Sequence, residues 1–427
     1  MQKNTPRPTA LSAPSTLSGP CLDTRAVHGG RDDFGHLGVH APPLDLSTTY
    51  PVTGVNEAAE SLDVMAAGGV PVAGQAIYAR LHNPTVDRFE KALAELEGAD
   101  GAVSFASGMA ALTACILAAR IARSVPAGRP VHVVAVRPIY GGSDHLLESG
   151  LLGTRTTWTE AEHVADAIED DTALVLLETP ANPTLQLVDI DAVVRQAGDV
   201  PVLVDSTFAT PVLQRPLEHD AVLTLHSATK FLGGHGDVMA GVVATSDPDW
   251  TAALRQIRVV TGAVLHPLAA YLLHRGLATL PVRVRAAQAG AVELAGRLSH
   301  HPAVQSVSFP GLDGQDPQGL IGRQMDGPGS LVTFETKGGF AAAARLVERL
   351  ELITAAVSLG STDTLIQHPA AMTHRIVTPE GREKGGITAS MLRLSVGLEA
   401  VDDLWRDLAQ ALDALPADQD LRLASGG

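Results

Sequence analysis

Short, mainly apolar runs alternate with amphipathic segments through the middle of the chain. These runs have few polar interruptions and occupy residues 102–105, 131–136, 173–178, 201–205 and 221–226. Such runs are typical of parallel strands that are buried on both faces, with helices packed above and below the sheet. The pattern therefore predicts an α/β fold with a large, mostly parallel sheet.

The pattern changes on either side of this region. Residues 1–20 are rich in Pro, Ser and Thr and predict a disordered tail. Residues 21–75 have little sustained periodicity and predict an irregular arm that clasps another subunit. After a large domain over 76–264, longer helical segments and a few strand-like runs predict a smaller C-terminal α/β domain with an antiparallel sheet over 265–427.

Charge and cysteine content narrow the classes of function. Of the 427 residues 47 are acidic and 31 basic, so the net charge of −16 opposes binding to nucleic acid or anionic lipid. Cys21 and Cys115 lie far apart and form no CxxC pair, which favours a reducing compartment. The most apolar helical segment, residues 109–122, is too short to span a bilayer. We predict a cytoplasmic protein that binds a small molecule, with no nucleic-acid or membrane partner.

Residues with distinctive chemistry follow the predicted strands. Lys230 stands in the stretch HSATKFLGGHGD, directly after the run at 221–226. Ligands of doubly wound sheets bind at the carboxyl ends of the strands. Burial at such a place disfavours the ammonium form of a lysine, and the neutral amine is a nucleophile toward aldehydes. Ser227 and Thr229 beside it can donate hydrogen bonds to an anion.

Three further strand ends supply complementary groups. Gly108 and Met109 open a predicted helix, where free amides and the helix dipole favour a phosphate. Asp205 ends the run PVLVD and can pair with a protonated ring nitrogen, while Tyr140 lies on a glycine-flanked loop and can stack on a flat ring. Together these residues offer an amine for an aldehyde, hydrogen-bond donors for a phosphate, a carboxylate for a ring nitrogen and an aromatic ring for stacking. This combination indicates a site for pyridoxal 5′-phosphate (PLP).

Other interpretations of single residues are possible. A lysine in a loop is usually solvated, and an aspartate after a strand is usually a turn residue. His28, His36 and His40 could suggest a metal site, but they lack ligand spacing, so we predict no metal. No GxGxxG or P-loop lysine motif is present, which excludes dinucleotide and nucleoside-triphosphate sites of those types.

Seven motifs resemble those of the Cys/Met-metabolism PLP enzymes, the cystathionine γ-synthase-like group. They are YARLHNPT, SGMAA, ETPANP, VDSTFATP, HSATKFLGGHGD, SLGSTDTLIQHPAAMTH and RLSVGLE, and the likeness runs from about residue 22 to about 412. The resemblance implies PLP-dependent transferase fold type I and a homotetramer built from tight dimers. It also implies a cofactor site shared between subunits.

The resemblance also implies roles for individual residues. Tyr78 and Arg80 would reach the cofactor phosphate of the neighbouring subunit. The other cofactor-binding residues would be Ser107, Gly108, Met109, Tyr140, Asn182, Asp205, Thr207, Ser227, Thr229 and Lys230. Ser358 and Arg393 would bind the substrate carboxylate. Lys230 and Tyr140 would be catalytic: the lysine moves the α-proton, and the tyrosine protonates the departing thiolate.

Single residues that differ between branches of this family predict which reaction the enzyme catalyses. Val357 precedes Ser-Leu-Gly where eukaryotic cystathionine γ-lyases typically place a glutamate, and several motifs look most like methionine γ-lyases. Departures from that branch are Gly142 in place of a cysteine, and Val259 and Val260 in place of a Lys-Asp pair. Ser206 stands where the family as a whole often has an Asn. We predict γ-elimination on methionine, homocysteine or cystathionine, releasing a thiol, 2-oxobutanoate and ammonia. Two alternatives remain: γ-replacement on an O-acyl-homoserine, and a non-enzymatic binding module with a PLP fold.

Overall fold

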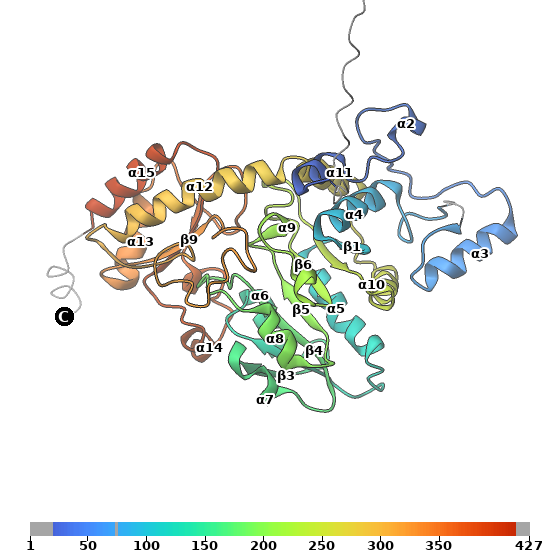
Figure 1. Ribbon diagram of the computed structural model, residues 1–427, viewed down its shortest axis with the longest axis horizontal. Coiled ribbons are helices and arrows are strands. Elements are labelled where there is room, and N and C mark those ends of the chain that lie inside the picture. The colour runs from blue at the N-terminus through green and yellow to red at the C-terminus, as the bar shows by residue number, and fades with distance from the viewer. Residues whose placement is uncertain (1–19, 73–75, 416–427) are drawn as a thin grey trace, which may run out of the picture.

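The computed structural model describes residues 20–72 and 76–415. Nearly all of the predicted tail lies outside the described residues. The arm is less irregular than predicted, because it contains the helices α1 (Leu22–His28), α2 (Phe34–Leu37) and α3 (Val55–Ala66). In Figure 1, α3 lies at one extremity of the molecule, far from the C-terminal helices.

A seven-stranded sheet forms the centre of the molecule, in the order β1-β7-β6-β5-β4-β2-β3. Its strands are β1 (Gly101–Phe105), β2 (Val131–Val136), β3 (Thr154–Thr159), β4 (Thr172–Glu178), β5 (Val202–Asp205), β6 (Leu223–His226) and β7 (Gly241–Thr245). Strands β2 to β6 pair in parallel, and β7 is antiparallel to both of its neighbours. This confirms the mostly parallel sheet.

Both faces of this sheet are buried, as the uninterrupted apolar runs predict. In β4, Leu174 and Leu176 belong to the core on the side of α5, whereas Val175 and Leu177 belong to the core on the side of α8. The helices around the sheet are α4 (Pro84–Glu97), α5 (Gly108–Ala122), α6 (Gly141–Glu148), α7 (Val164–Ala167), α8 (Ile190–Ala197), α9 (Thr210–Leu213) and α10 (Pro248–Thr261).

Helix α4 begins and ends where its sequence predicts. Asn83 caps it by accepting hydrogen bonds from the amides of Thr85 and Val86, at 3.0 and 3.2 Å. Pro84 occupies the first helical position, where its missing N–H is not needed. Gly98 ends the helix with φ of 69°, a left-handed conformation that favours glycine.

A second, five-stranded sheet follows, in the order β10-β11-β12-β9-β8, and all of its pairs are antiparallel except β10 with β11. Its strands are β8 (Val304–Ser308), β9 (Leu331–Thr336), β10 (Thr354–Ala355), β11 (Leu365–Gln367) and β12 (Met391–Ser395). The accompanying helices are α11 (Pro267–Leu277), α12 (Leu280–Ser299), α13 (Gly339–Arg349), α14 (Pro379–Lys384) and α15 (Val401–Asp413). Figure 1 shows α12, α13 and α15 gathered around β9, while α11 packs against α4. None of the described helices combines the length and the apolar character that crossing a bilayer requires.

Candidate active site

A cavity of about 620 Å³ opens at the carboxyl ends of β4, β5 and β6. It brings together twelve of the fourteen predicted site residues: Ser107, Gly108, Met109, Tyr140, Asn182, Asp205, Thr207, Ser227, Thr229, Lys230, Ser358 and Arg393. These residues come from both halves of the chain. The loops after the large sheet therefore meet the second sheet at this cavity.

The start of α5 forms one wall and is suited to a phosphate. Ser107 caps this helix by accepting a hydrogen bond from the amide of Ala110 at 3.1 Å. A Cβ atom on Gly108 would lie 3.0 Å from Cβ of Ser227, so glycine allows the helix start to approach that loop closely. Amides at the start of a long helix attract an anion. Thr229 exchanges hydrogen bonds with Ala240 at 3.0 and 3.1 Å, which fixes its hydroxyl in the wall.

Asp205 lies at the base of the cavity, at the end of β5. Its Oδ1 accepts hydrogen bonds from the amide and the hydroxyl of Thr207, at 3.0 and 2.5 Å. Within the described part of the chain, no hydrogen bond reaches its other oxygen, Oδ2. Burial raises the pKa of Asp205, although the bonds from Thr207 act against this. A cationic ring nitrogen at Oδ2 would offset the cost of burying the carboxylate.

Lys230 extends its amine across the cavity toward the loop before β11. Its Nζ donates a hydrogen bond to Oγ of Ser358 at 2.6 Å. Burial, and next the charge of Arg393, lower the pKa of Lys230 to about 8. The sequence-based expectation of a lysine with a lowered pKa agrees with this environment. Ser358 has φ of 87°, a left-handed conformation that costs a non-glycine residue about 1–3 kcal/mol.

Arg393 enters the cavity from β12 and is suited to a carboxylate. Its side chain is fully buried, and its Nη1 and Nη2 donate hydrogen bonds to Oδ1 of Asn182 at 2.6 Å and to the carbonyl of Ser358 at 3.0 Å. With its amide oxygen turned toward the guanidinium, Gln367 also accepts from Nη2 at 2.8 Å. No carboxylate of a described residue forms an ion pair with Arg393, so its positive charge can bind one from a substrate.

Tyr140 stands at the start of α6, and its ring faces the cavity. The ring lies over Gly142, because a Cβ atom at that position would come within 2.5 Å of Cε1 of the ring. Its backbone amide donates a hydrogen bond to Glu178 at 2.6 Å. Glycine at position 142 is therefore matched to this position of the ring.

Two predicted residues do not line this cavity. Tyr78 is exposed just beyond the arm, and the guanidinium of Arg80 lies 5.7 Å from the centre of its ring. Arg80 donates a hydrogen bond to the backbone carbonyl of Val259 at 2.8 Å. Sequence reasoning missed two residues that do belong to the site, Glu178 and Gln367. Both lie within quoted motifs, but the motifs do not say which way their side chains point.

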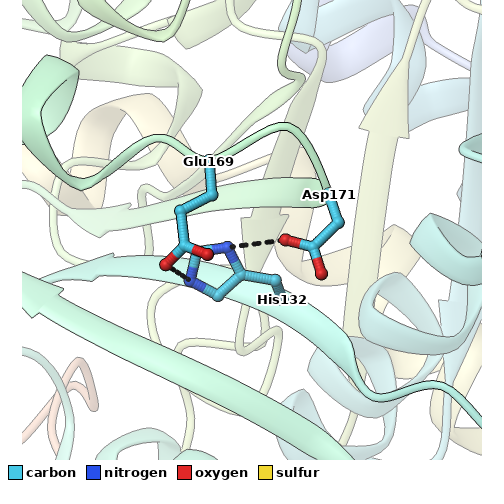
Figure 2. A group of neighbouring side chains, drawn as sticks. All are labelled: His132, Glu169 and Asp171. Atoms are coloured by element: carbon cyan, nitrogen blue, oxygen red, sulfur yellow. Dashed lines mark ion pairs between the residues drawn. The ribbon is translucent and has the colours of Figure 1, made fainter.

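A separate charged cluster lies at the opposite, amino-terminal ends of the strands. Figure 2 shows His132 between Glu169 and Asp171, with each ring nitrogen 3.9 Å from a carboxylate oxygen. The ring nitrogens have closer partners, the hydroxyls of Thr172 and Thr157 at 2.8 and 2.9 Å. Both carboxylates also pair with Arg155 at 2.8 Å. We interpret this cluster as an ion-pair network rather than a metal site.

The fold and the cavity together define the class of protein. A mixed seven-stranded sheet carries the lysine and the aspartate at neighbouring strand ends, with a phosphate-binding helix start beside them. These residues fit pyridoxal phosphate, and the molecule is a PLP-dependent enzyme of fold type I. The chain belongs to the Cys/Met metabolism PLP-dependent enzymes, whose family model matches residues 23–413.

Individual relatives agree with this family. The chain is 59% identical over 393 residues to an L-methionine γ-lyase of Brevibacterium sandarakinum, which covers 92% of this chain and 97% of that protein. A cystathionine γ-lyase structure from Micromonospora echinospora is 38% identical, with a TM-score of 0.82 over 93% of this chain and 100% of that one. A cystathionine γ-synthase from Xanthomonas oryzae, solved with aminoacrylate and cysteine, is 35% identical, with a TM-score of 0.82 over 92% and 98% of the two chains.

These findings confirm the predicted family, fold class and cofactor. They also confirm an enzyme that acts as a PLP-dependent carbon–sulfur lyase and eliminates the γ-substituent of a sulfur amino acid. The alternative of a non-enzymatic binding module is set aside. Because lyase and synthase structures match this fold equally well, the fold alone does not distinguish elimination from replacement.

Proposed function

We propose that the preferred substrate is L-methionine, which the enzyme cleaves with one molecule of water to methanethiol, 2-oxobutanoate and ammonia. The apolar open side of the cavity carries this proposal. Met239, Val357 and Met372 line it, and all three are largely exposed despite being apolar. The methylthio group of methionine is compatible with such a wall. The second amino-acid group of cystathionine would instead need charged partners.

The charged groups of the cavity support the same preference. In the described part of the chain they are Glu178, Asp205, Lys230 and Arg393. Lys230 and Asp205 would serve the cofactor, Arg393 the α-carboxylate, and Glu178 is occupied by two backbone amides. None remains for a charged γ-substituent.

The proposed chemistry divides between the cofactor and the protein. When bound, pyridoxal phosphate supplies an aldehyde that condenses with amines and a protonated ring that accepts electrons from the α-carbon. Arg393 would bind and orient the substrate carboxylate. Lys230, whose pKa is lowered to about 8, would take the α-proton and deliver it further along the substrate. Tyr140, which also lines the cavity, would protonate the departing thiolate.

We infer that two copies of the chain complete each site. Tyr78 and Arg80 would bind the cofactor phosphate of a neighbouring subunit, since they lie outside the cavity of their own chain. The arm that precedes them exposes a series of large apolar side chains: Val39, Leu44, Leu46, Val52, Val55, Leu62, Val64, Val70 and Val72. Such a surface is suited to a second copy. A homotetramer in the cytoplasm remains our proposal, and the two unpaired cysteines favour that compartment.

A substrate panel tests the reaction. We expect 2-oxobutanoate from methionine at a kcat/KM at least tenfold above that for cystathionine, with homocysteine between them. Faster product formation from an O-acyl-homoserine plus a thiol would establish γ-replacement instead. The shared site is tested by mixing inactive Arg80→Ala and Lys230→Ala chains. Mixed dimers should regain part of the activity, because one of their two sites has all its residues intact.

A further inference from the structure

Glu178 is a buried carboxylate in the cavity to which the reaction described above gives no role. It is the last residue of β4, it lines the cavity, and only 5% of it is exposed. Its Oε2 accepts a hydrogen bond from the amide of Tyr140 at 2.6 Å. Its Oε1 accepts one from the amide of Asn182 at 3.1 Å. Each carboxylate oxygen therefore binds a different loop.

These two loops hold opposite ends of the substrate in the proposed reaction. Tyr140 would act on the leaving group. Asn182 accepts a hydrogen bond from Arg393 at 2.6 Å, and Arg393 faces the substrate carboxylate. A single side chain thus joins the backbone of the proton donor to the residue that orients the carboxylate-binding guanidinium. A displacement of Glu178 would change the distance between these two ends.

The surroundings of Glu178 disfavour its ionised form. Its nearest neighbour in the sheet register is Asp205, a second acid. Burial, and next Asp205, raise the pKa of Glu178 well above its ordinary value, against the two amides and Arg393. Asp407 offers a contrast: it is also nearly buried, at 6% exposed, and binds three backbone amides, but these lower its pKa. A buried acid with a strongly raised pKa that lines a cavity indicates a functional role.

We propose that Glu178 is a positioning residue that sets the separation between Tyr140 and Arg393 by binding the amides of both supporting loops. It does not touch the reacting atoms. Its effect on the reaction rests on the proposed function, but its effect on the two loops does not.

Glu178→Gln tests the proposal with almost no change of volume. The glutamine oxygen can accept from one amide, while its NH₂ group is set against the other. We expect kcat to fall and KM for methionine to rise, lowering kcat/KM about 10- to 100-fold. Cofactor absorbance should be retained, since Lys230, Asp205 and the phosphate site are untouched. Hydrogen exchange in the protein without cofactor should quicken at the amides of Tyr140 and Asn182.

Asp407→Asn is the matched control, because it alters a carboxylate that also caps backbone amides outside the cavity. It should quicken exchange at residues 351–353 only and leave kcat/KM within twofold. If Glu178→Gln does not fold, Glu178→Asp keeps the charge but is too short to reach both amides, and it should show the same pattern to a smaller degree.

Unchanged exchange at both loops together with kcat/KM within twofold of the wild type would overturn the proposal. A loss of stability with no kinetic change would do the same. Faster exchange in a protein whose wild type does not cleave methionine would leave the positioning role standing and refute the proposed function.

Discussion

The two ends of the large sheet carry charged clusters of opposite character. At the amino-terminal ends, Arg155 pairs with both Glu169 and Asp171, and both ring nitrogens of His132 have hydroxyl partners. At the carboxyl ends, Lys230 and Arg393 donate only to neutral oxygens among the described residues. Each charged group of the first cluster therefore already has a partner within the protein. In the second cluster, the positive charges of Lys230 and Arg393 are left for a ligand to balance.

This difference has a physical basis in exposure. Glu169 and Asp171 are about half exposed, so water helps to stabilise their charges and the pairs form at little cost. At the other end Arg393 is fully buried and Lys230 is partly buried, and burial lowers the pKa of Lys230 to about 8 and that of Arg393 to about 10. Buried charges without ion partners are expensive, which is why they identify a binding site.

The largest expected effect is that of Lys230→Ala at the carboxyl-terminal end. Turnover of methionine should fall by about 10²- to 10⁴-fold or more, since a general base and the covalent link to the cofactor are both lost. Release of 2-oxobutanoate measures this, and Lys337→Ala, on the exposed surface, is the control. Borohydride reduction of the holoenzyme should label the peptide that contains Lys230. A label on another residue would refute the site.

The lowered pKa of Lys230 predicts the pH dependence of cofactor uptake. Only the neutral amine attacks an aldehyde. About one tenth of a lysine with a pKa of about 8 is neutral at pH 7, against about one in 3000 for an ordinary lysine. The rate of uptake by protein freed of cofactor should rise about tenfold per unit below pH 8 and level off above it. A rise that continues to pH 10 would contradict the lowered pKa.

Replacing an arginine by lysine at each end of the large sheet tests whether the two charged clusters differ in function. Arg393→Lys should reduce kcat/KM for methionine about 10- to 100-fold, mainly through KM, because an ammonium cannot bind a carboxylate with two parallel hydrogen bonds. Arg155→Lys should leave kcat/KM within twofold. Equal losses in the two variants would mean that the arginine at the cavity has only a structural role.

Gly142→Ala tests the position of the Tyr140 ring. The added Cβ would lie 2.5 Å from Cε1 of the ring, so the ring must leave its present position. We expect kcat to fall about tenfold with little change in KM, because the proton donor moves while Arg393 does not. Gly296→Ala, where a Cβ meets open space, is the control. An unchanged kcat would show that the ring adapts without cost to the reaction.

The sequence predicted most of the strands whose burial is uniform, but it did not predict β7, GVVAT, although every residue of that strand is buried. The apolar runs of β4, β5 and β6 mark strands buried on both faces, and the residues that follow them line the cavity. It did not predict β3, TRTTWT, in which every residue is only partly buried, because an edge strand needs no apolar run. Helix α3 was missed for another reason: its apolar residues recur at helical spacing, but the glycines and prolines on either side of it indicated an irregular arm.

The missed site residues show a different limit. Glu178 ends an apolar run, and its sequence position does not distinguish a solvated strand end from a buried carboxylate that binds two loops. Gln367 lies in β11, and its contact with Arg393 depends on the pairing of β11 with β12. Residue types and order predicted the chemistry of the cavity, but contacts between distant segments follow only from their packing.

Glu169→Gln should have the smallest effect, at the amino-terminal end. The hydrogen bond from Arg155 lowers the pKa of Glu169, so its contribution to stability is present at neutral pH and lost as the pH falls through the acid range. At neutral pH the variant should unfold at most a few degrees below the wild type, and high salt should reduce the difference. Activity should be unchanged. If a divalent cation raised the unfolding temperature of the wild type but not of the variant, the cluster of Figure 2 would be a metal site and the contrast between the two ends would fail.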